Sequence, residues 1–101
     1  MEPIQFAIVG GGWRTGFFLQ IARELPERFQ VTGMLVRDAA KGAALERKWD
    51  VRTFRTLDEA LRGEPAFAVV SVPWKVAPEM LGALAERGVP ALCETPPAPD
   101  L

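Results

Sequence analysis

Short apolar runs alternate along the chain with longer stretches of mixed polarity. Two runs, 4–9 and 67–72, are almost wholly apolar, which is typical of parallel strands that are buried on both faces. Weaker strand patterns cover 31–36, 51–54 and 89–93. Because the intervals between these runs are long enough for a crossover helix, the pattern predicts five parallel strands.

Two helices are predicted in the first half of the chain. The first begins at about Thr15 and stops at Pro26, because proline cannot continue a helix. The second spans 39–49, although Gly42 lowers its intrinsic helix propensity. The apolar side chains expected to face the sheet are Phe17, Phe18, Ile21, Ala22 and Leu25 in the first helix and Ala40, Ala44, Leu45 and Trp49 in the second.

Two further helices are predicted in the second half. Thr56 begins a short one, since its hydroxyl and Glu59 three residues later match a capping box. The other spans 75–87 and meets Gly88, a residue type that favours helix C-termini. The side chains expected to pack inward are Leu57, Ala60, Leu61, Met80, Leu81 and Leu84. The alternation of strand and helix predicts an α/β fold, a doubly wound parallel sheet of Rossmann type with helices on both faces.

The overall composition excludes several classes of function. The 101 residues carry a net charge of −1 and are 49% hydrophobic, as in an ordinary globular domain. No excess of positive charge is present to neutralise a phosphate backbone, so we expect no nucleic-acid partner. No uncharged run approaches the ~20 residues of a membrane span, and the N-terminus does not resemble a secretory signal. We therefore expect a cytoplasmic protein with no membrane partner.

The inventory of reactive side chains restricts the chemistry further. The sequence contains no histidine and one cysteine, Cys93, which excludes a Ser-His-Asp triad and a thiolate zinc cluster. We therefore predict no metal site. Cys93 falls on a strand predicted to be buried, where a cysteine behaves as a small hydrophobe. Any reaction must use carboxylates, lysines, hydroxyls or a bound cofactor.

A glycine-rich turn joins the first predicted strand to the first helix. Gly10 and Gly12 match the first two glycines of the G-x-G-x-x-G fingerprint, in the strand–turn–helix context where it is meaningful. Gly10 permits a tight turn, and Gly12 lets the backbone approach a pyrophosphate at the helix N-terminus. Thr15 takes the place of the third glycine. We predict a dinucleotide site that includes Trp13 and Arg14 as well as these residues, with a turn that merely needs positive φ as the alternative.

The end of the second strand bears on the choice of cofactor. In dinucleotide-binding folds this point lies beside the adenosine ribose, about 20 residues after the glycine turn. Arg37 follows Val36 here, and a guanidinium suits a 2′-phosphate, which favours NADP. Asp38 comes one residue later and keeps NAD possible, since a carboxylate accepts hydrogen bonds from the ribose hydroxyls.

Three segments together make the chain similar to the N-terminal domain of the Gfo/Idh/MocA oxidoreductases. Residues 6–13 resemble the first strand and glycine turn of that family. Residues 68–73 resemble its fourth strand and the loop that follows, and 89–96 are placed like its C-E-K-P segment. The resemblance spans essentially the whole chain and implies an NAD(P)-binding Rossmann domain.

The resemblance also implies which later residues lie near the cofactor. It places one loop under the dinucleotide and the signature segment near the nicotinamide, and the residues concerned are Ser71, Val72, Pro73, Trp74, Glu94 and Thr95. The family's lysine in this signature contacts substrate and assists proton transfer, but Thr95 occupies that position here. Because a hydroxyl cannot supply a cation, we assign no catalytic residue in this chain. The alternative for 95–97 is a rigid exit turn without chemistry.

The family's second α/β domain, which supplies the substrate pocket, is absent from the sequence. We expect 1–101 to be one domain and a fragment, the cofactor-binding half of an NAD(P)-dependent oxidoreductase that is inactive alone. The resemblance implies hydride transfer between nicotinamide C4 and a sugar-, polyol- or cyclitol-like alcohol. The alternative is a non-catalytic NAD(P)-binding module used for sensing or partner contact. Apolar surface left by the missing domain would make a homo-oligomer possible.

Overall fold

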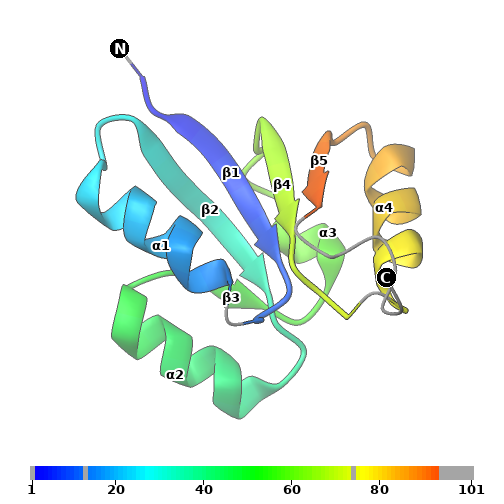
Figure 1. Ribbon diagram of the computed structural model, residues 1–101, viewed down its shortest axis with the longest axis horizontal. Coiled ribbons are helices and arrows are strands. Elements are labelled where there is room, and N and C mark those ends of the chain that lie inside the picture. Colours follow the sequence, from blue (N-terminus) through cyan, green and yellow to red (C-terminus); the bar gives the residue numbers. More distant parts are fainter. Residues whose placement is uncertain (1, 13, 74, 94–101) are drawn as a thin grey trace, which may run out of the picture.

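A computed structural model describes residues 2–12, 14–73 and 75–93. Strands and helices alternate along these residues (Figure 1), as β1 Ile4–Val9, α1 Thr15–Glu24, β2 Phe29–Leu35, α2 Ala39–Trp49, β3 Thr53–Phe54, α3 Leu57–Ala60, β4 Phe67–Val70, α4 Ala77–Glu86 and β5 Ala91–Cys93. No helix in the described part of the chain is long and apolar enough to cross a membrane.

The strands form one parallel sheet in the order β3-β2-β1-β4-β5. From β1 the chain moves outward to β2 and β3, and then returns so that β4 pairs with the other side of β1. The strand order therefore reverses between β1 and β4, which makes this boundary the topological switch point of the sheet. The Rossmann-type fold predicted from the sequence is confirmed.

Side chains of the central strand alternate between two hydrophobic clusters, one on each face of the sheet. In β1, Phe6 and Ile8 join the cluster that packs under α1 and α2, while Ala7 and Val9 join the cluster under α3 and α4. This alternation follows from the period of two in a strand, and it explains why both faces of β1 are apolar. The other buried members are Leu19, Met34, Val36 and Val69 on the first face and Leu35, Ala60, Ala68, Val70, Met80 and Leu84 on the second.

The buried face of α1 differs from the prediction. Phe17, Ile21 and Leu25 were expected to face the sheet but are exposed, by 57%, 42% and 45% respectively. The residues that pack against the sheet are Phe18, Leu19 and Ala22. The apolar residues of α1 form two stripes at helical spacing, and only one stripe can meet the sheet, so periodicity alone could not choose between them.

In α2 the buried position is a glycine rather than an alanine. Ala40 and Ala44 are exposed, which contradicts the prediction, whereas Leu45 and Trp49 are half-buried against the core as expected. Gly42 is buried because α2 lies very close to the side chains of Thr53 in β3 and of Arg55 just after it. The absence of a side chain at Gly42 is therefore what permits this contact, at some cost in helix propensity.

The later elements are shorter than predicted. The strand predicted over 67–72 ends at Val70, the helix predicted over 75–87 begins at Ala77, and β5 begins only at Ala91. Pairing of β4 stops because its partner β1 ends at Val9 and the chain turns away at Gly10, and Pro90 has no backbone N–H to donate to a ladder before β5. Cys93 is exposed, so its predicted burial is wrong. The reason is that β5 is an edge strand whose three residues are all exposed in the described structure.

The N-terminus of α3 confirms the predicted cap. The Glu59 N–H donates to Thr56 Oγ1 at 3.3 Å, and the Thr56 hydroxyl donates to Glu59 Oε1 at 2.9 Å. The carboxylate thus bonds the hydroxyl and not the Thr56 backbone N–H of a full capping box. This short helix covers Gly33 of β2 on the face opposite α1.

A pair of leucine variants tests which face of α1 is buried. Leu19→Ala should lower the free energy of unfolding by about 2–4 kcal/mol, because Leu19 is 2% exposed and its loss leaves a cavity. Leu25→Ala should lower it by less than about 1 kcal/mol, because that side chain is 45% exposed. Urea denaturation of both variants measures the difference, and equal losses would contradict the described orientation of α1.

Candidate functional site

The turn after β1 depends on a glycine at position 10. Gly10 has a φ of +104°, a conformation that L side chains rarely adopt. Its N–H donates to the Leu35 carbonyl at 2.9 Å, which ties the turn to β2. On its other side, a Cβ would overlap the Ser71 carbonyl oxygen and would lie 2.8 Å from Val72 Cγ1. The turn is thus held where β2, β1 and β4 all end.

Thr15 closes the turn from inside. Its hydroxyl donates to the Gly12 carbonyl at 2.6 Å, and its own N–H donates to the same oxygen at 3.0 Å. Thr15 is 2% exposed and begins α1, while Arg14 before it is exposed. The threonine in place of the third fingerprint glycine therefore stabilises the turn by two hydrogen bonds.

The middle of the turn presents backbone donors. Within the described ranges, neither the Gly11 nor the Gly12 N–H donates to another group of the protein. A Cβ on Gly12 would lie 3.0 Å from Ser71 Oγ, so the absence of a side chain at Gly12 lets the turn pack closely against the residue that follows β4. Two adjacent amides before a helix N-terminus are suited to an anion such as a pyrophosphate.

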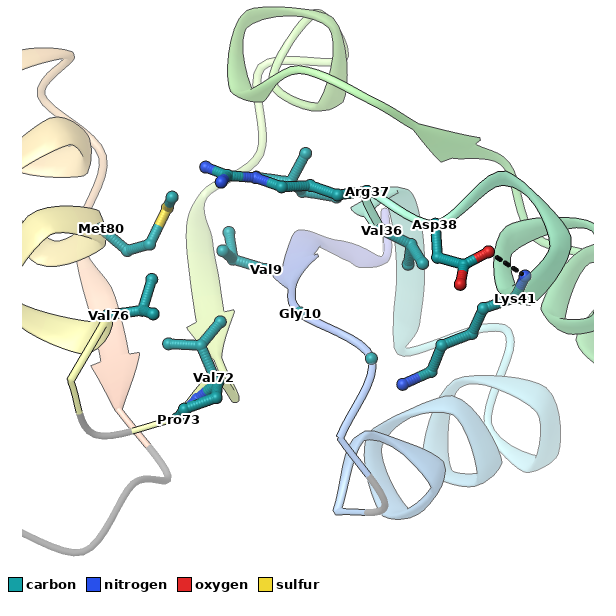
Figure 2. A pocket seen from close by; sticks show the side chains of 12 residues that line it. Val9, Gly10, Val36, Arg37, Asp38, Lys41, Val72, Pro73, Val76 and Met80 are labelled. Carbon is teal, nitrogen blue, oxygen red and sulfur yellow. Dashed lines mark hydrogen bonds between the residues drawn. The ribbon is translucent and has the colours of Figure 1, made fainter.

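A pocket of about 270 Å³ opens at the carboxyl ends of β1, β2 and β4. Figure 2 shows Val72, Pro73, Val76 and Met80 on one side of it and the glycine turn and the end of β2 on the other. Its lining is Val9, Gly10, Gly11, Leu35, Val36, Arg37, Asp38, Lys41, Val72, Pro73, Val76 and Met80. This is the edge of an open α/β sheet at which ligands bind, beside the switch point.

Three charged residues follow β2 at the rim of this pocket. Arg37 extends toward Met80 across the opening, whereas the Lys41 side chain extends toward the glycine turn (Figure 2). A Cβ on Gly11 would lie 2.9 Å from Lys41 Cε and 3.2 Å from its Nζ, so the ammonium group lies beside the turn. Asp38 is the N-cap of α2, and its Oδ1 accepts from the N–H groups of Ala40 and Lys41 at 2.9 and 3.1 Å. The rim is therefore cationic, with two positive groups and one carboxylate that is engaged in capping.

The structure brings some of the predicted residues together in this pocket and leaves others out of it. Those that line it are Gly10, Arg37, Val72 and Pro73. Gly12 and Ser71 lie beside each other next to the pocket, and Arg14 and Thr15 do not line it. Trp13, Trp74, Glu94 and Thr95 lie outside the described residues.

Lys41 is the functional candidate that the sequence analysis missed. It lies in the first turn of α2, where the helix dipole favours acidic side chains, and no acidic residue is present in that turn. A lysine at such a position, on the helix that follows the second strand, is a signal that could have drawn attention to it. The positive charge of Lys41 destabilises the N-terminus of the helix, but it can bind an anion.

A hydrogen-bonded pair ties α2 to β3 behind the pocket. Glu46 Oε2 accepts from the Thr53 N–H at 3.0 Å and from the Thr53 hydroxyl at 2.8 Å. These two bonds lower the pKa of Glu46 below its ordinary value of 4.5, and the positive charge of Arg55 adds to the effect. Near neutral pH the carboxylate thus helps to hold α2 in place.

A second hollow, of about 650 Å³, lies at the opposite edge of the sheet. It is open between α1 and α2, and Trp49 lines it with the Arg23 guanidinium 4.4 Å from the ring centroid. Although it is larger, it lies at the amino ends of β1 and β2, away from the edge where open α/β sheets bind ligands. No group of three histidine, cysteine, aspartate or glutamate side chains in the described residues could hold a metal.

The parallel sheet, the reversal of strand order and the glycine turn together define a dinucleotide-binding Rossmann domain. A family model described as "Oxidoreductase family, NAD-binding Rossmann fold" matches residues 4–101. The chain therefore belongs to the Gfo/Idh/MocA oxidoreductase family, and it corresponds to the NAD-binding domain of that family. None of the curated proteins matches the chain in sequence.

Several solved structures share this fold. The WlbA dehydrogenase of Chromobacterium violaceum, in complex with NADH and UDP-GlcNAcA, superposes with a TM-score of 0.86 at 20% identity, over 97% of this chain and 29% of its own. GenD2 from gentamicin A biosynthesis, in complex with NAD, gives 0.80 at 26% identity, over 92% and 27%. Biliverdin reductase from Synechocystis sp. PCC 6803, in complex with biliverdin and NADP⁺, gives 0.82 at 18% identity, over 95% and 30%. The chain thus spans less than a third of the length of these proteins.

Alanine at each of the two fingerprint glycines should have very different effects on stability. Gly10→Ala should cost about 3 kcal/mol or more, because the new Cβ meets backbone atoms and the φ is unfavourable. Gly12→Ala should cost less than about 1 kcal/mol, because its one tight contact is the rotatable hydroxyl of Ser71 and the Ser71 carbonyl oxygen lies at an ordinary 3.5 Å. Thermal unfolding followed by circular dichroism measures both, and a stable Gly10→Ala protein would contradict the described turn.

The link between Glu46 and Thr53 should depend on pH. Because the folded pKa lies below the ordinary 4.5, the link stabilises the fold above that value and loses its effect as the pH falls through the lower, folded pKa. Glu46→Gln should therefore melt at a lower temperature than the unmodified chain at pH 7, and the difference should shrink below about pH 4.5. Glu27→Gln, at an exposed carboxylate after α1, is the control. A difference for Glu46→Gln that is constant with pH would exclude this account.

Proposed function

We propose that this chain is the NADP-binding part of an oxidoreductase, with the cofactor held at the carboxyl edge of the sheet. The observation that carries the proposal is the pair of cations, Arg37 and Lys41, at the rim of a pocket whose wall is the glycine turn. The family binds NAD-type dinucleotides, and two cations after the second strand are the chemistry that an additional phosphate on the adenosine ribose requires.

The parts of the dinucleotide can be assigned to parts of the site. The pyrophosphate would be bound by the N–H groups of Gly11 and Gly12, next to the positive end of α1. The adenosine ribose would lie at the end of β2, as in other dinucleotide-binding folds. The Lys41 ammonium would then contact the 2′-phosphate as a point charge, and the planar guanidinium of Arg37 would bind it by two donors. Figure 2 shows both side chains at this rim.

Asp38 supports NAD as the second candidate cofactor. One of its oxygens caps α2, and the carboxylate also lines the pocket, where it could accept a hydrogen bond from a ribose hydroxyl. WlbA and GenD2, which share the fold, were solved with NADH and NAD, whereas the biliverdin reductase was solved with NADP⁺. We favour NADP because two positive groups, Arg37 and Lys41, line the pocket beside the end of β2.

For the reaction, we propose oxidation or reduction of a sugar-, polyol- or cyclitol-like alcohol. A bound nicotinamide supplies hydride transfer at its C4. The fold relative WlbA was solved with UDP-GlcNAcA, and another is a UDP-N-acetylglucosamine 3-dehydrogenase, which supports a sugar-like substrate. The loop 71–74 and the signature residues Glu94 and Thr95 are proposed to lie near the nicotinamide, on the strength of the family resemblance. We assign no catalytic acid, since Thr95 stands at the lysine position of the family.

We further propose that this 101-residue chain binds the cofactor but does not turn over substrate alone. The solved relatives are more than three times as long, and the resemblance assigns the substrate pocket to a second domain. A non-catalytic NAD(P)-binding module is the alternative, and Thr95 in place of the lysine favours it. Turnover of a polyol by a full-length protein would decide for the enzyme, while cofactor binding without turnover would favour the module.

Two charge-removing variants test the choice of cofactor. Calorimetric titration of the chain should show saturable binding, tighter for NADPH than for NADH. Arg37→Ala should weaken NADPH binding about 10- to 100-fold, because a charged hydrogen bond contributes about 1.5–3 kcal/mol. Lys41→Met should weaken it about tenfold, and both variants should change NADH affinity by less than about twofold.

Arg47→Ala provides the matched control, since it removes the same charge from an exposed position in the last turn of α2. It should leave both affinities unchanged. Equal losses of NADPH and NADH affinity in Arg37→Ala would contradict NADP selection by this rim. Absence of binding of either cofactor to the folded, unmodified chain would overturn the proposed function.

A further inference from the structure

Arg55 lies behind the end of β2, outside the pocket lining. Its Nη1 donates to the Val36 carbonyl at 2.9 Å and to Thr53 Oγ1 at 3.2 Å. Val36 is also bound from β3 through its own N–H, which donates to the Phe54 carbonyl at 3.0 Å. Val36, the residue before Arg37, is therefore fixed at its N–H by the backbone of β3 and at its carbonyl by this guanidinium.

The first turn of α2 packs against the same guanidinium. A Cβ on Gly42 would lie 2.7 Å from Arg55 Nη2 and 2.8 Å from Nη1, so the helix backbone packs directly against the charged plane. Gly42 belongs to the first turn of α2, since its N–H donates to the Asp38 carbonyl at 2.9 Å. Arg55 thus contacts both ends of the turn that carries Arg37 and Lys41.

The hydrogen-bond partner of Arg55 in β3, Thr53, is itself held in place by α2. Thr53, which accepts from Arg55, is held by Glu46 of α2 through two hydrogen bonds of 3.0 and 2.8 Å. The helix, the third strand and the end of the second strand are in this way joined through one side chain. A guanidinium is suited to this task because its donors are fixed in one plane, which a flexible ammonium cannot reproduce.

We propose that Arg55 is a positioning residue for cofactor selection: by holding the Val36 carbonyl and the first turn of α2, it fixes the backbone from which the side chains of Arg37 and Lys41 reach for a 2′-phosphate. The inference rests on the proposed NADP-binding function. Arg37 and Lys41 extend to different parts of the rim in the structure, so they can meet on one phosphate only if the backbone that carries them is fixed, whereas NADH makes no such demand. Loosening the turn should therefore reduce NADPH affinity selectively.

Binding of both cofactors to Arg55 variants provides the first test. Arg55→Gln should weaken NADPH about five- to tenfold and NADH by less than about twofold, as measured by calorimetry on the chain. Arg55→Lys should recover little of the NADPH affinity, because it restores the charge without the planar fork. Arg52→Gln removes an equal charge from an exposed side chain three residues earlier and should leave both affinities unchanged.

A cofactor-independent test measures the turn itself. In the absence of nucleotide, the amides of Lys41 and Gly42, which donate to Asp38, should exchange with deuterium about tenfold faster in Arg55→Gln than in the unmodified chain. The amide of Ser71, which donates to the Val9 carbonyl in the adjoining strand, should exchange at the same rate in both. This comparison separates loosening of the turn from general unfolding.

The outcomes separate the two proposals. Selective loss of NADPH affinity together with faster exchange at Lys41 and Gly42 would support the positioning role. Equal loss for both cofactors, full recovery in Arg55→Lys, or unchanged amide exchange would overturn it. If the unmodified chain binds neither cofactor, the proposed function fails, and the role of Arg55 in cofactor selection fails with it. The exchange data would still show whether Arg55 stabilises the first turn of α2. An unmodified chain that binds NADPH tightly while Arg55→Gln does so equally well would leave the proposed function intact and refute only the positioning role.

Discussion

The contact between the glycine turn and the end of β4 is the constraint on which the rest of the structure depends. β1 and β4 are neighbours in the sheet, and the Ser71 carbonyl lies where a side chain on Gly10 would be. The chain must therefore leave β1 with a positive φ and turn sharply before α1 can begin. This places the N–H groups of Gly11 and Gly12 at the switch point, next to the pocket. Loss of this approach would remove both the turn and the donors that follow it.

The fold was largely predictable because its central strands have a clear pattern. β1 and β4 bury both faces, so their sequences are continuous apolar runs that few other elements would produce. The ends of elements were less predictable, since the strand signal at 71–72 continues after pairing has stopped at Val70. The buried face of α1 could not be derived either, because that helix carries a second apolar stripe at Phe17, Ile21 and Leu25.

The candidate site was predictable where local spacing determines it. Gly10 and Arg37 follow from their positions at the ends of the first two strands, and the pocket contains both. Lys41 was missed, although a cation in the first turn of a helix is destabilising and therefore suggests a functional role. Arg55 was also missed, since it bonds the carbonyl of Val36, 19 residues earlier in the sequence, and this contact follows no motif. Such contacts depend on tertiary packing and have no signature in one sequence.

Asp38 has two roles, and this restricts which residues at the pocket rim can change in sequence. Its carboxylate is the N-cap of α2 and also part of the pocket rim, so replacing it would weaken the helix whichever cofactor is bound. Arg37 and Lys41 carry no comparable structural duty in the described contacts. Substitutions that change nucleotide preference, natural or engineered, are therefore better tolerated at Arg37 and Lys41 than at Asp38, whose carboxylate also stabilises α2.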